Sequence, residues 1–229
     1  MSGGCVLTTK RIVCLANSFR PGGSCVAGIE LVDGGFGPWV RPISHRANEA
    51  INDEEQTCTD GTRLSVLDIV EIDFDDHRPE GHQTENWLIT EGARWRKVGR
   101  LEAEELAGAV VPANAPLWGP ATGTYNGTRD QVHRVSAEKL NSSLTLIRPR
   151  RASIEVLYNP FKEKNQLWVS FKWSDVRHKI LLTDPVQFAR YDTQAGDVHD
   201  IQKPFMCISL AKVWEASGHA SKLVAGIVT

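Results

Sequence analysis

Short strand-like runs recur along the whole chain, and they constrain its fold more than any other feature. The runs are rich in Val, Ile and aromatic residues, and clusters of Gly, Pro, Asn and Asp separate them, which is typical of β-strands joined by turns. We expect strands at residues 11–16, 26–31, 38–41, 67–74, 87–90, 94–98, 144–148, 153–158, 166–173, 178–183, 207–210 and 223–228. The pattern predicts an all-β protein.

Only two segments show a helical pattern. "RLEAEELAGAV" begins at Arg100, and "DPVQFARYD" begins at Asp184, an expected N-cap followed by proline at the first helical position. Pro and Gly are concentrated in "VVPANAPLWGPATGTYNGT", which begins at Val110 and separates two groups of strands. We therefore expect two small β-barrels packed together, with few short helices: an N-terminal barrel at 1–110, a connection at 111–128 and a C-terminal barrel at 129–229.

Composition excludes several classes of protein. The chain of 229 residues is 41% hydrophobic and 24% charged, as in an ordinary globular protein. It has no apolar run of about 18 residues and no leader pattern, so we expect no membrane association and a cytoplasmic location. The five cysteines are odd in number and lack a CxxC, which predicts reduced thiols and no zinc site.

Charge is distributed unevenly. Residues 1–100 hold 11 Lys and Arg against 15 Asp and Glu, and residues 101–229 hold 15 against 13, so the net charge of −2 divides into −4 and +2. A strongly basic domain would indicate a polyanion partner, and a net charge of +2 is too small to make residues 101–229 such a domain. Nucleic-acid binding would therefore depend on a local cluster of basic residues.

Three separated motifs resemble the dual OB-fold domain found in bacterial proteins. They are "IVCLANSFRPGGSCVAGIEL" with "GPWVRPIS", then "LDIVEI" with "ENWLI", and finally "CISLA" with "KLVAGIV". The resemblance spans nearly the whole chain. It implies two small β-barrels and association with nucleic acid, DNA in preference to RNA, in a DNA-modification or phage-defence setting. It implies no particular reaction and no cofactor.

The loop "NSFRPGG" between the first two strands has two interpretations. As an ordinary hairpin turn, it uses Gly22 and Gly23 for backbone conformations with positive φ. As a binding finger, it presents Asn17, Ser18 and Arg20 at a barrel mouth, where the planar guanidinium suits phosphate or guanine. Both interpretations stay open at this point.

Two strands are candidates for a stacking surface. Side chains alternate along a strand, so "WVRP" places Trp39 and Arg41 on one face, and "QLWVSFKW" places Trp168 and Lys172 opposite its core-facing residues. An exposed tryptophan beside a cation suits single-stranded nucleic acid. Alternatively, Trp39 covers a barrel end and the second barrel covers Trp168. Further phosphate contacts are expected from the "RPRR" segment, namely Arg148, Arg150 and Arg151.

An acidic strand, "EIDFDDH", raises the question of a metal site. Glu71, Asp73 and Asp75 share one face, and carboxylates at such spacing can bind a hard cation. A solvent-facing charged surface with Ile72 and Phe74 directed inward explains the same alternation. We therefore predict no metal site.

Cysteine chemistry is the candidate for an enzyme. Cys25 follows the cationic loop, where a neighbouring positive charge would favour its nucleophilic thiolate, whereas Cys14 is in phase with apolar residues and is expected in the core. His45, Asp68 or Glu71 would be the base. The target would be an electrophilic carbon on a modified base in DNA, for example a nitrile on a deazaguanine-type base that becomes hydrated.

These observations leave three hypotheses about function. The first is a nucleic-acid-binding module that uses the basic and aromatic residues named above. The second is an enzyme that modifies a nucleobase through Cys25 or Cys14. The third is a protein–protein module of a multi-subunit complex, in which exposed tryptophans would anchor the interface.

Overall fold

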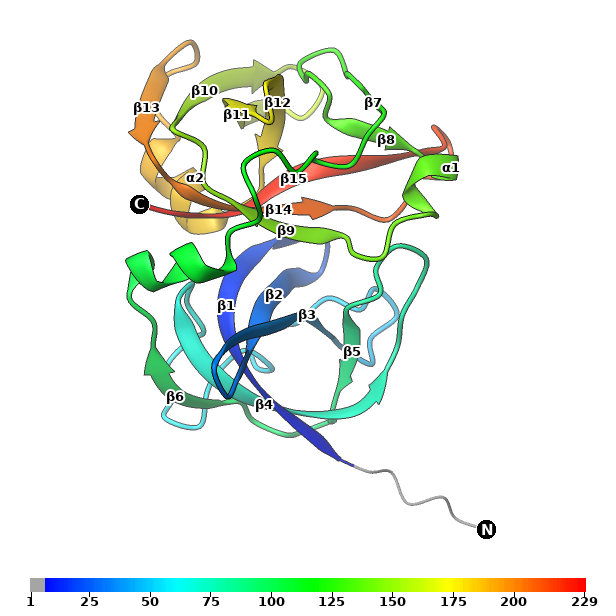
Figure 1. Ribbon diagram of the computed structural model, residues 1–229, viewed down its shortest axis with the longest axis vertical. Helices are drawn as coiled ribbons and strands as arrows, with labels where there is room; N and C mark the ends of the chain where they lie inside the picture. Colours follow the sequence, from blue (N-terminus) through cyan, green and yellow to red (C-terminus); the bar gives the residue numbers. More distant parts are fainter. Residues whose placement is uncertain (1–6) are drawn as a thin grey trace. The chain divides into compact units, whose positions relative to one another are not determined.

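The computed structural model describes residues 7–229 and divides the chain into two compact units, one ending at Gly108 and one beginning at Ala109 (Figure 1). We call them the N-terminal unit and the C-terminal unit. Strands dominate both, and the helices are few and short. None of the helices in the described residues is long and apolar enough to cross a membrane.

The N-terminal unit is a closed barrel. Its elements are β1 (Thr8–Arg20), β2 (Gly23–Val32), β3 (Gly35–Ile43), β4 (Asp68–His77), β5 (Asn86–Ile89), β6 (Arg96–Arg100) and the 3-10 helix η1 (Ala103–Ala109). The strand order is β1-β2-β3-β5-β4-β6, and β1 also pairs with β4, so the sheet closes on itself. The pairing of β3 with β5 is parallel.

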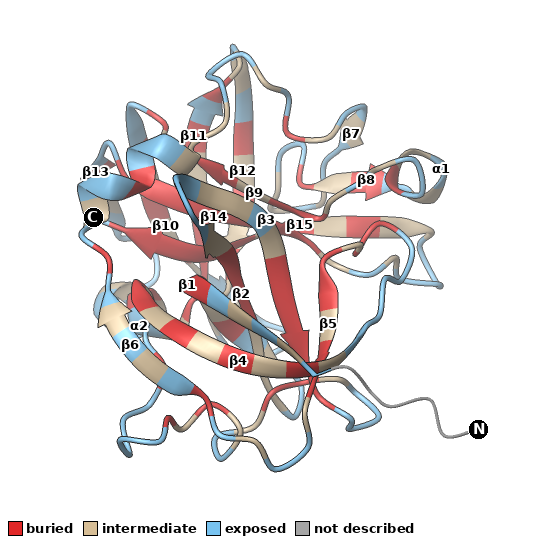
Figure 2. Ribbon diagram, turned by 60° about the horizontal axis from the view of Figure 1, so that its bottom comes forward, coloured by how far each residue is buried: buried red, intermediate tan, exposed pale blue. Residues whose placement is uncertain are grey.

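The expected alternation holds along β4. Val70, Ile72 and Phe74 are buried in the barrel core, while Glu71 and Asp73 face outward, as the alternating colours of this strand show (Figure 2). Glu71 pairs with arginines of two neighbouring strands, and the guanidinium of Arg11 lowers its pKa. Glu71 is thus held by two arginines, while Asp73 accepts a hydrogen bond from the hydroxyl of Thr9.

The C-terminal unit repeats this plan. Its elements are β7 (Ala121–Thr122), β8 (Gln131–His133), α1 (Arg134–Ala137), β9 (Leu144–Ile147), β10 (Arg151–Asn159), β11 (Lys164–Trp173), β12 (Val176–Leu182), α2 (Pro185–Tyr191), β13 (Val198–Gln202), β14 (Phe205–Leu210) and β15 (His219–Val228). The main order is β13-β10-β11-β12-β15-β14-β9, with β12 and β15 parallel. Only three residues separate β9, at one end of this order, from β10, which lies next to β13 near the other end, so β9 and β10 form one bent strand that closes the barrel.

Both units therefore have the OB plan of a five-stranded barrel in which the third and fifth strands run parallel. In the C-terminal unit, β12 is the third strand of the barrel, and helix α2 follows it before β14. The prediction of an all-β chain with two OB-like barrels and few short helices is confirmed.

Local differences from the sequence predictions have simple causes. The helix expected from Arg100 is a 3-10 helix over Ala103–Ala109, whereas the helix after Asp184 forms as expected, with Asp184 as its N-cap. Strand β13, "VHDIQ", was not expected, because only one of its five residues is buried and its composition is polar. It forms because its backbone pairs with the edge of β10.

The cap of α2 provides a test of the C-terminal fold. Asp184 is buried, and its carboxylate accepts hydrogen bonds from the backbone N–H groups of Val186, Gln187 and Ile227. We expect Asp184→Ala to lower the free energy of unfolding by about 2 kcal/mol, because three buried donors lose their acceptor. Urea denaturation measures this, with the exposed Asp175→Asn as a control that should change it by less than about 0.5 kcal/mol. Equal midpoints for the two variants would contradict the assigned cap.

Candidate nucleic-acid interface

The loop between β1 and β2 is a two-residue turn. Pro21 precedes Gly22, whose φ of 82° fits the second central position of a type II turn. Gly23 is required for a different reason, since a Cβ there would lie 2.4 Å from the carbonyl oxygen of Ile51. The turn thus fits closely against the segment that follows β3.

The polar residues expected in this loop lie at the end of β1, and their side chains have partners within the N-terminal unit. The amide of Asn17 donates to Gln56 Oε1 at 2.8 Å, and the hydroxyl of Ser18 donates to the backbone oxygen of Cys25 at 3.3 Å. Arg20 forms an ion pair with Glu49 at 3.3 Å. These contacts favour the interpretation of the loop as a structural turn.

The prediction that Arg41 shares an exposed face with Trp39 is wrong. Arg41 is 1% exposed, and its guanidinium lies 3.1 Å from the carboxylate of Glu85, itself buried. Trp39 is half-buried. The simple alternation fails because this end of β3 is buried on both faces, so the charged side chain is held by an internal ion pair rather than by solvent.

The cysteine hypothesis gains no geometric support. Cys14 is completely buried in the barrel core, where it packs as a small apolar residue. The thiol of Cys25 is half-buried and has no hydrogen-bond partner among residues 7–229. His45 instead contacts Asp75 at 3.2 Å and the backbone oxygen of Ile89 at 3.0 Å. Cys5 lies outside the described residues.

Strand β11 has the alternation that the sequence predicts, with one difference. Leu167, Val169, Phe171 and Trp173 are buried in the core, and Lys172 is exposed on the opposite face. Trp168 is on that opposite face but is only 7% exposed. The prediction of an open Trp168 stacking surface is therefore wrong.

A hollow lies on the outer face of β10, β11, β12 and β13. Register aligns Asp200, Ser153, Ser170 and Lys179 in one row across the four strands. Small hydroxyl side chains in the middle of this row leave a cavity of about 690 Å³ between the larger side chains at its edges. We call it the basic groove.

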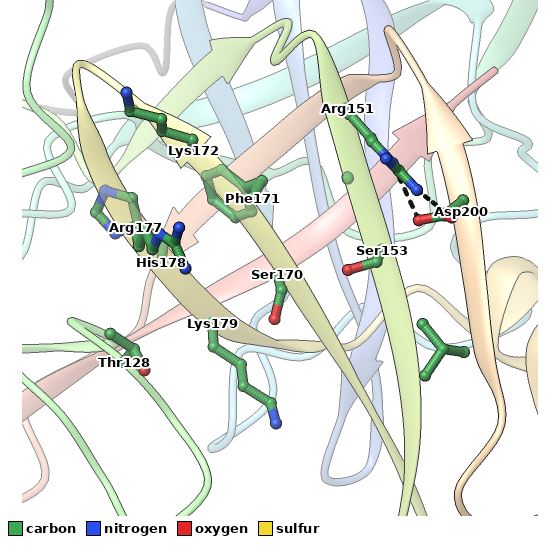
Figure 3. Close-up of a pocket in the computed structure, with 12 residues that line it drawn as sticks. Thr128, Arg151, Ser153, Ser170, Phe171, Lys172, Arg177, His178, Lys179 and Asp200 are labelled. Atoms are coloured by element: carbon green, nitrogen blue, oxygen red, sulfur yellow. Dashed lines mark hydrogen bonds and ion pairs between the residues drawn. The ribbon is translucent and has the colours of Figure 1, made fainter.

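Four cations line the basic groove. Lys172 and Arg177 lie on one side and Arg151 on the other, where it pairs with Asp200 (Figure 3). The fourth, Lys179, pairs with a carboxylate of β10. The guanidinium of Arg177 has no hydrogen-bond or ion-pair partner among residues 7–229, so it is the most available of the four for an anionic ligand.

The predicted "RPRR" cluster is dispersed. Arg151 lines the basic groove, whereas Arg148 stacks over the ring of Phe205 at 4.1 Å and donates to the backbone oxygen of Lys203. Arg150 is exposed and does not line the groove. The bend between β9 and β10 directs neighbouring arginines to different places.

A second cavity of about 370 Å³ adjoins the next row of the same face. Its floor is an apolar row formed by Trp168, Leu181 and Leu223, which register aligns across β11, β12 and β15. Tyr125 and Phe161, both almost fully exposed, stand at its rim. We call it the aromatic pocket.

Sequence reasoning missed several residues of this surface. Arg177 and Lys179 alternate with buried residues along β12, a pattern that the sequence does contain. Tyr125 and Phe161 lie in loops, and no local pattern indicates that two such distant residues border one pocket. Lys222 was missed because it occupies an inward position of a strand, between Ala220 and Val224.

Lys222 is the most unusual group of the C-terminal unit. It is 1% exposed, its ammonium has no hydrogen-bond partner among the described residues, and it lines the aromatic pocket. Burial lowers its pKa to about 8, against an opposing attraction from Asp130. The neighbouring His178 is also buried, and burial together with Lys222 lowers the pKa of this imidazole to about 4, so it is neutral near pH 7.

The difference in net charge is larger when the chain is divided at the boundary between the two units. Residues 109–229 carry 15 Lys and Arg against 10 Asp and Glu, a net charge of +5. Residues 1–108 carry 11 against 18, a net charge of −7. The basic groove thus belongs to the unit whose field attracts anions.

Comparison with known families identifies the chain. The family described as "Dual OB-containing domain" matches residues 10–227, nearly the whole chain. The chain belongs to the dual OB-containing domain family. The topology of both barrels agrees with this assignment, and the resemblance found in the sequence is confirmed.

Other comparisons add little. No curated protein matches the chain. Among solved structures, the crystal structure of the tetrameric p202 HIN2 matches at 9% identity and a TM-score of 0.33, covering 99% of this chain and 96% of that one. A structure described as the molecular basis for abrogation of activation of pro-inflammatory cytokines matches at 11% identity and a TM-score of 0.35, covering 100% and 97%. Likeness of this degree carries no argument about ligands.

The buried lysine leads to a prediction about stability and pH. Because the pKa of Lys222 is about 8 in the folded chain and about 10.4 when unfolded, the unfolded chain binds more protons between these values, and stability rises with pH there. We expect Lys222→Met to be more stable than the wild type by up to about 3 kcal/mol below pH 8. The difference should shrink as the pH approaches 10.4. Urea denaturation at pH 7 and pH 10 measures it, and a variant less stable than the wild type at pH 7 would contradict this account.

Proposed function

We propose that the C-terminal unit binds single-stranded nucleic acid across the outer face of β10, β11 and β12. The observation that carries the proposal is the basic groove, in which four cations surround a cavity of about 690 Å³ directly beside the aromatic pocket. OB-fold barrels present their second and third strands to oligonucleotides, and here these strands are β11 and β12.

Phosphate is the ligand that suits the basic groove. Lining residues contribute the four cations and one carboxylate, that of Asp200. Arg151, Lys172 and Lys179 already pair with carboxylates, so a phosphate must compete for them, whereas Arg177 has no such partner among the described residues. Arginine is also suited to bidentate contact with phosphate oxygens.

The aromatic pocket favours a single strand over a duplex. Tyr125 and Phe161 are almost fully exposed at its rim, and an exposed ring gains most when an unpaired base stacks on it. Each such stacking contact stabilises the complex by about 1–3 kcal/mol. Paired bases would keep their faces within the duplex and would not reach these rings. The strand would thus run with phosphates in the groove and bases toward the pocket.

Salt dependence tests this proposal. If all four cations of the groove contact phosphates, counterion release predicts a slope of about −3 for the logarithm of the association constant against the logarithm of salt concentration. The double variant Arg177→Gln with Lys179→Gln should reduce this slope to about −1.4, because two contacts are lost. Fluorescence anisotropy of a labelled DNA oligonucleotide measures both values.

The matched control removes two arginines from the N-terminal unit. Arg63→Gln with Arg78→Gln changes the total charge by the same amount, and both residues are exposed. We expect this variant to keep the wild-type slope. Equal losses in the two double variants, or no binding of the wild type at low salt, would refute the groove as the binding surface.

A further inference from the structure

A small chamber lies at one end of the barrel of the C-terminal unit. It has a volume of about 90 Å³ and adjoins the turn between β11 and β12. Trp173, at the end of β11, and Leu117, in the segment between the barrels, line it, and both belong to the hydrophobic core. The chamber is therefore on the inward side of the barrel wall, whereas the basic groove is on its outer face. We call it the end chamber.

Two buried polar side chains, His178 and Lys222, face this inward side. Alternation along β12 places His178 inward with Ile180, and alternation along β15 places Lys222 inward with Ala220 and Val224. Both residues line the end chamber. Burial lowers the pKa of His178, and the charge of Lys222 lowers it further, as expected when the two side chains are close.

Each of these side chains has a polar atom without a partner. Nζ of Lys222 and Nδ1 of His178 make no hydrogen bond to any of the described residues. Buried polar atoms without partners oppose folding, and a buried ammonium opposes it most. Asp130 counteracts the effect of burial on the pKa of Lys222, but its carboxylate already accepts hydrogen bonds from Thr124. A sequence selected for stability alone would have an apolar residue at Lys222.

Arg129 supplies a second cation to the end chamber. It is exposed and lines the chamber, and its guanidinium has no hydrogen-bond or ion-pair partner among residues 7–229. No carboxylate is among the described residues that line the chamber, in contrast to the basic groove, where Asp200 pairs with Arg151. Because exposed residues such as Arg129 and Gly119 line it, the chamber adjoins the surface.

We propose that the end chamber binds one phosphate group, held by the ammonium of Lys222 and the guanidinium of Arg129, with His178 as a third contact. A volume of about 90 Å³ corresponds to about three water molecules, which suits a tetrahedral oxyanion. Two cations balance its charge of about −2 near pH 7. Phosphate presents oxygen acceptors and a P–OH donor, so it can bond either tautomer of the neutral imidazole.

The size of the end chamber restricts where this phosphate comes from. An internal phosphodiester carries a sugar on each side, and about 90 Å³ leaves no room for them. The ligand is therefore inorganic phosphate or the terminal phosphate of a strand. The ammonium is covered by neighbouring atoms, so the flexible side chain of Lys222 turns into the chamber when phosphate binds. The inference does not depend on the proposed strand binding.

Calorimetric titration with inorganic phosphate at pH 7 and constant ionic strength tests the end chamber. The double variant Arg177→Gln with Lys179→Gln serves as the background, because it removes two cations of the basic groove. This background should bind one phosphate per chain. Adding Lys222→Met or Arg129→Gln should weaken the binding about tenfold or more, the effect expected when a charged hydrogen-bond donor is lost.

Matched controls remove exposed cations of the same unit. Lys139→Met and Arg150→Gln, added to the same background, should leave the phosphate affinity unchanged, since both residues are exposed and line neither the end chamber nor the basic groove. Circular dichroism confirms that every variant is folded before titration. Arg129→Gln changes an exposed residue, so its result is informative even if Lys222→Met were to unfold the chain.

A comparison of strands separates the two sources of phosphate. An oligonucleotide of one sequence is titrated into the wild type with a 5′-phosphate, with a 3′-phosphate and without a terminal phosphate. Tighter binding of one phosphorylated strand, lost in Lys222→Met, assigns the end chamber to a strand end. Equal binding of the three strands, together with one inorganic phosphate bound by the background, assigns it to free phosphate.

Two results would overturn the inference. The first is a background that binds no inorganic phosphate together with a wild type that binds the three strands equally, which leaves strand binding intact and means that the chamber holds only water. The second is unchanged phosphate affinity in both Lys222→Met and Arg129→Gln, which places the phosphate elsewhere. A wild type that binds none of the strands would instead refute the proposed function, and the inorganic phosphate titration would still decide the end chamber.

Discussion

The antiparallel register of β11 against β12 determines where every part of the candidate interface lies. It sets Ser170 opposite Lys179 in the basic groove and Trp168 opposite Leu181 in the floor of the aromatic pocket. Because side chains alternate along a strand, a slip of one residue would move this whole set into the core and expose the apolar residues. The core-facing residues of β11 oppose such a slip, so the packing of the barrel interior also fixes the candidate binding surface outside it.

The two units share a fold and differ in charge, and this difference is the reason why we propose the binding surface on the C-terminal unit. In the N-terminal unit, arginines form ion pairs with carboxylates of the same unit. Examples are the buried pair of Arg41 with Glu85 and the surface pairs of Glu71. In the C-terminal unit, a net charge of +5 accompanies a groove in which the guanidinium of Arg177 has no partner among the described residues. A total charge of −2 for the chain therefore conceals an anion-attracting half.

Much of the fold follows from local sequence patterns, because alternation along β4 and β11 reports directly which face is buried. The same rule fails for Arg41, since an arginine can be buried when a distant Glu85 supplies its charge partner. It also fails for Trp168, which is only 7% exposed although it lies on the outward face of β11. The candidate site is harder to predict for the same reason. Tyr125, Phe161 and Lys222 come together only through tertiary structure.

Photocross-linking tests the central claim, that nucleic acid binds the outer face of β11 and β12, most directly. A single-stranded oligonucleotide with halogenated uracil is irradiated in complex with the full chain, and the linked residues are identified by mass spectrometry. The account predicts links to Tyr125, Phe161 or Trp168, the aromatic residues of the pocket. Links confined to aromatic residues of the N-terminal unit, such as Phe19, Trp39 or Trp87, would contradict it.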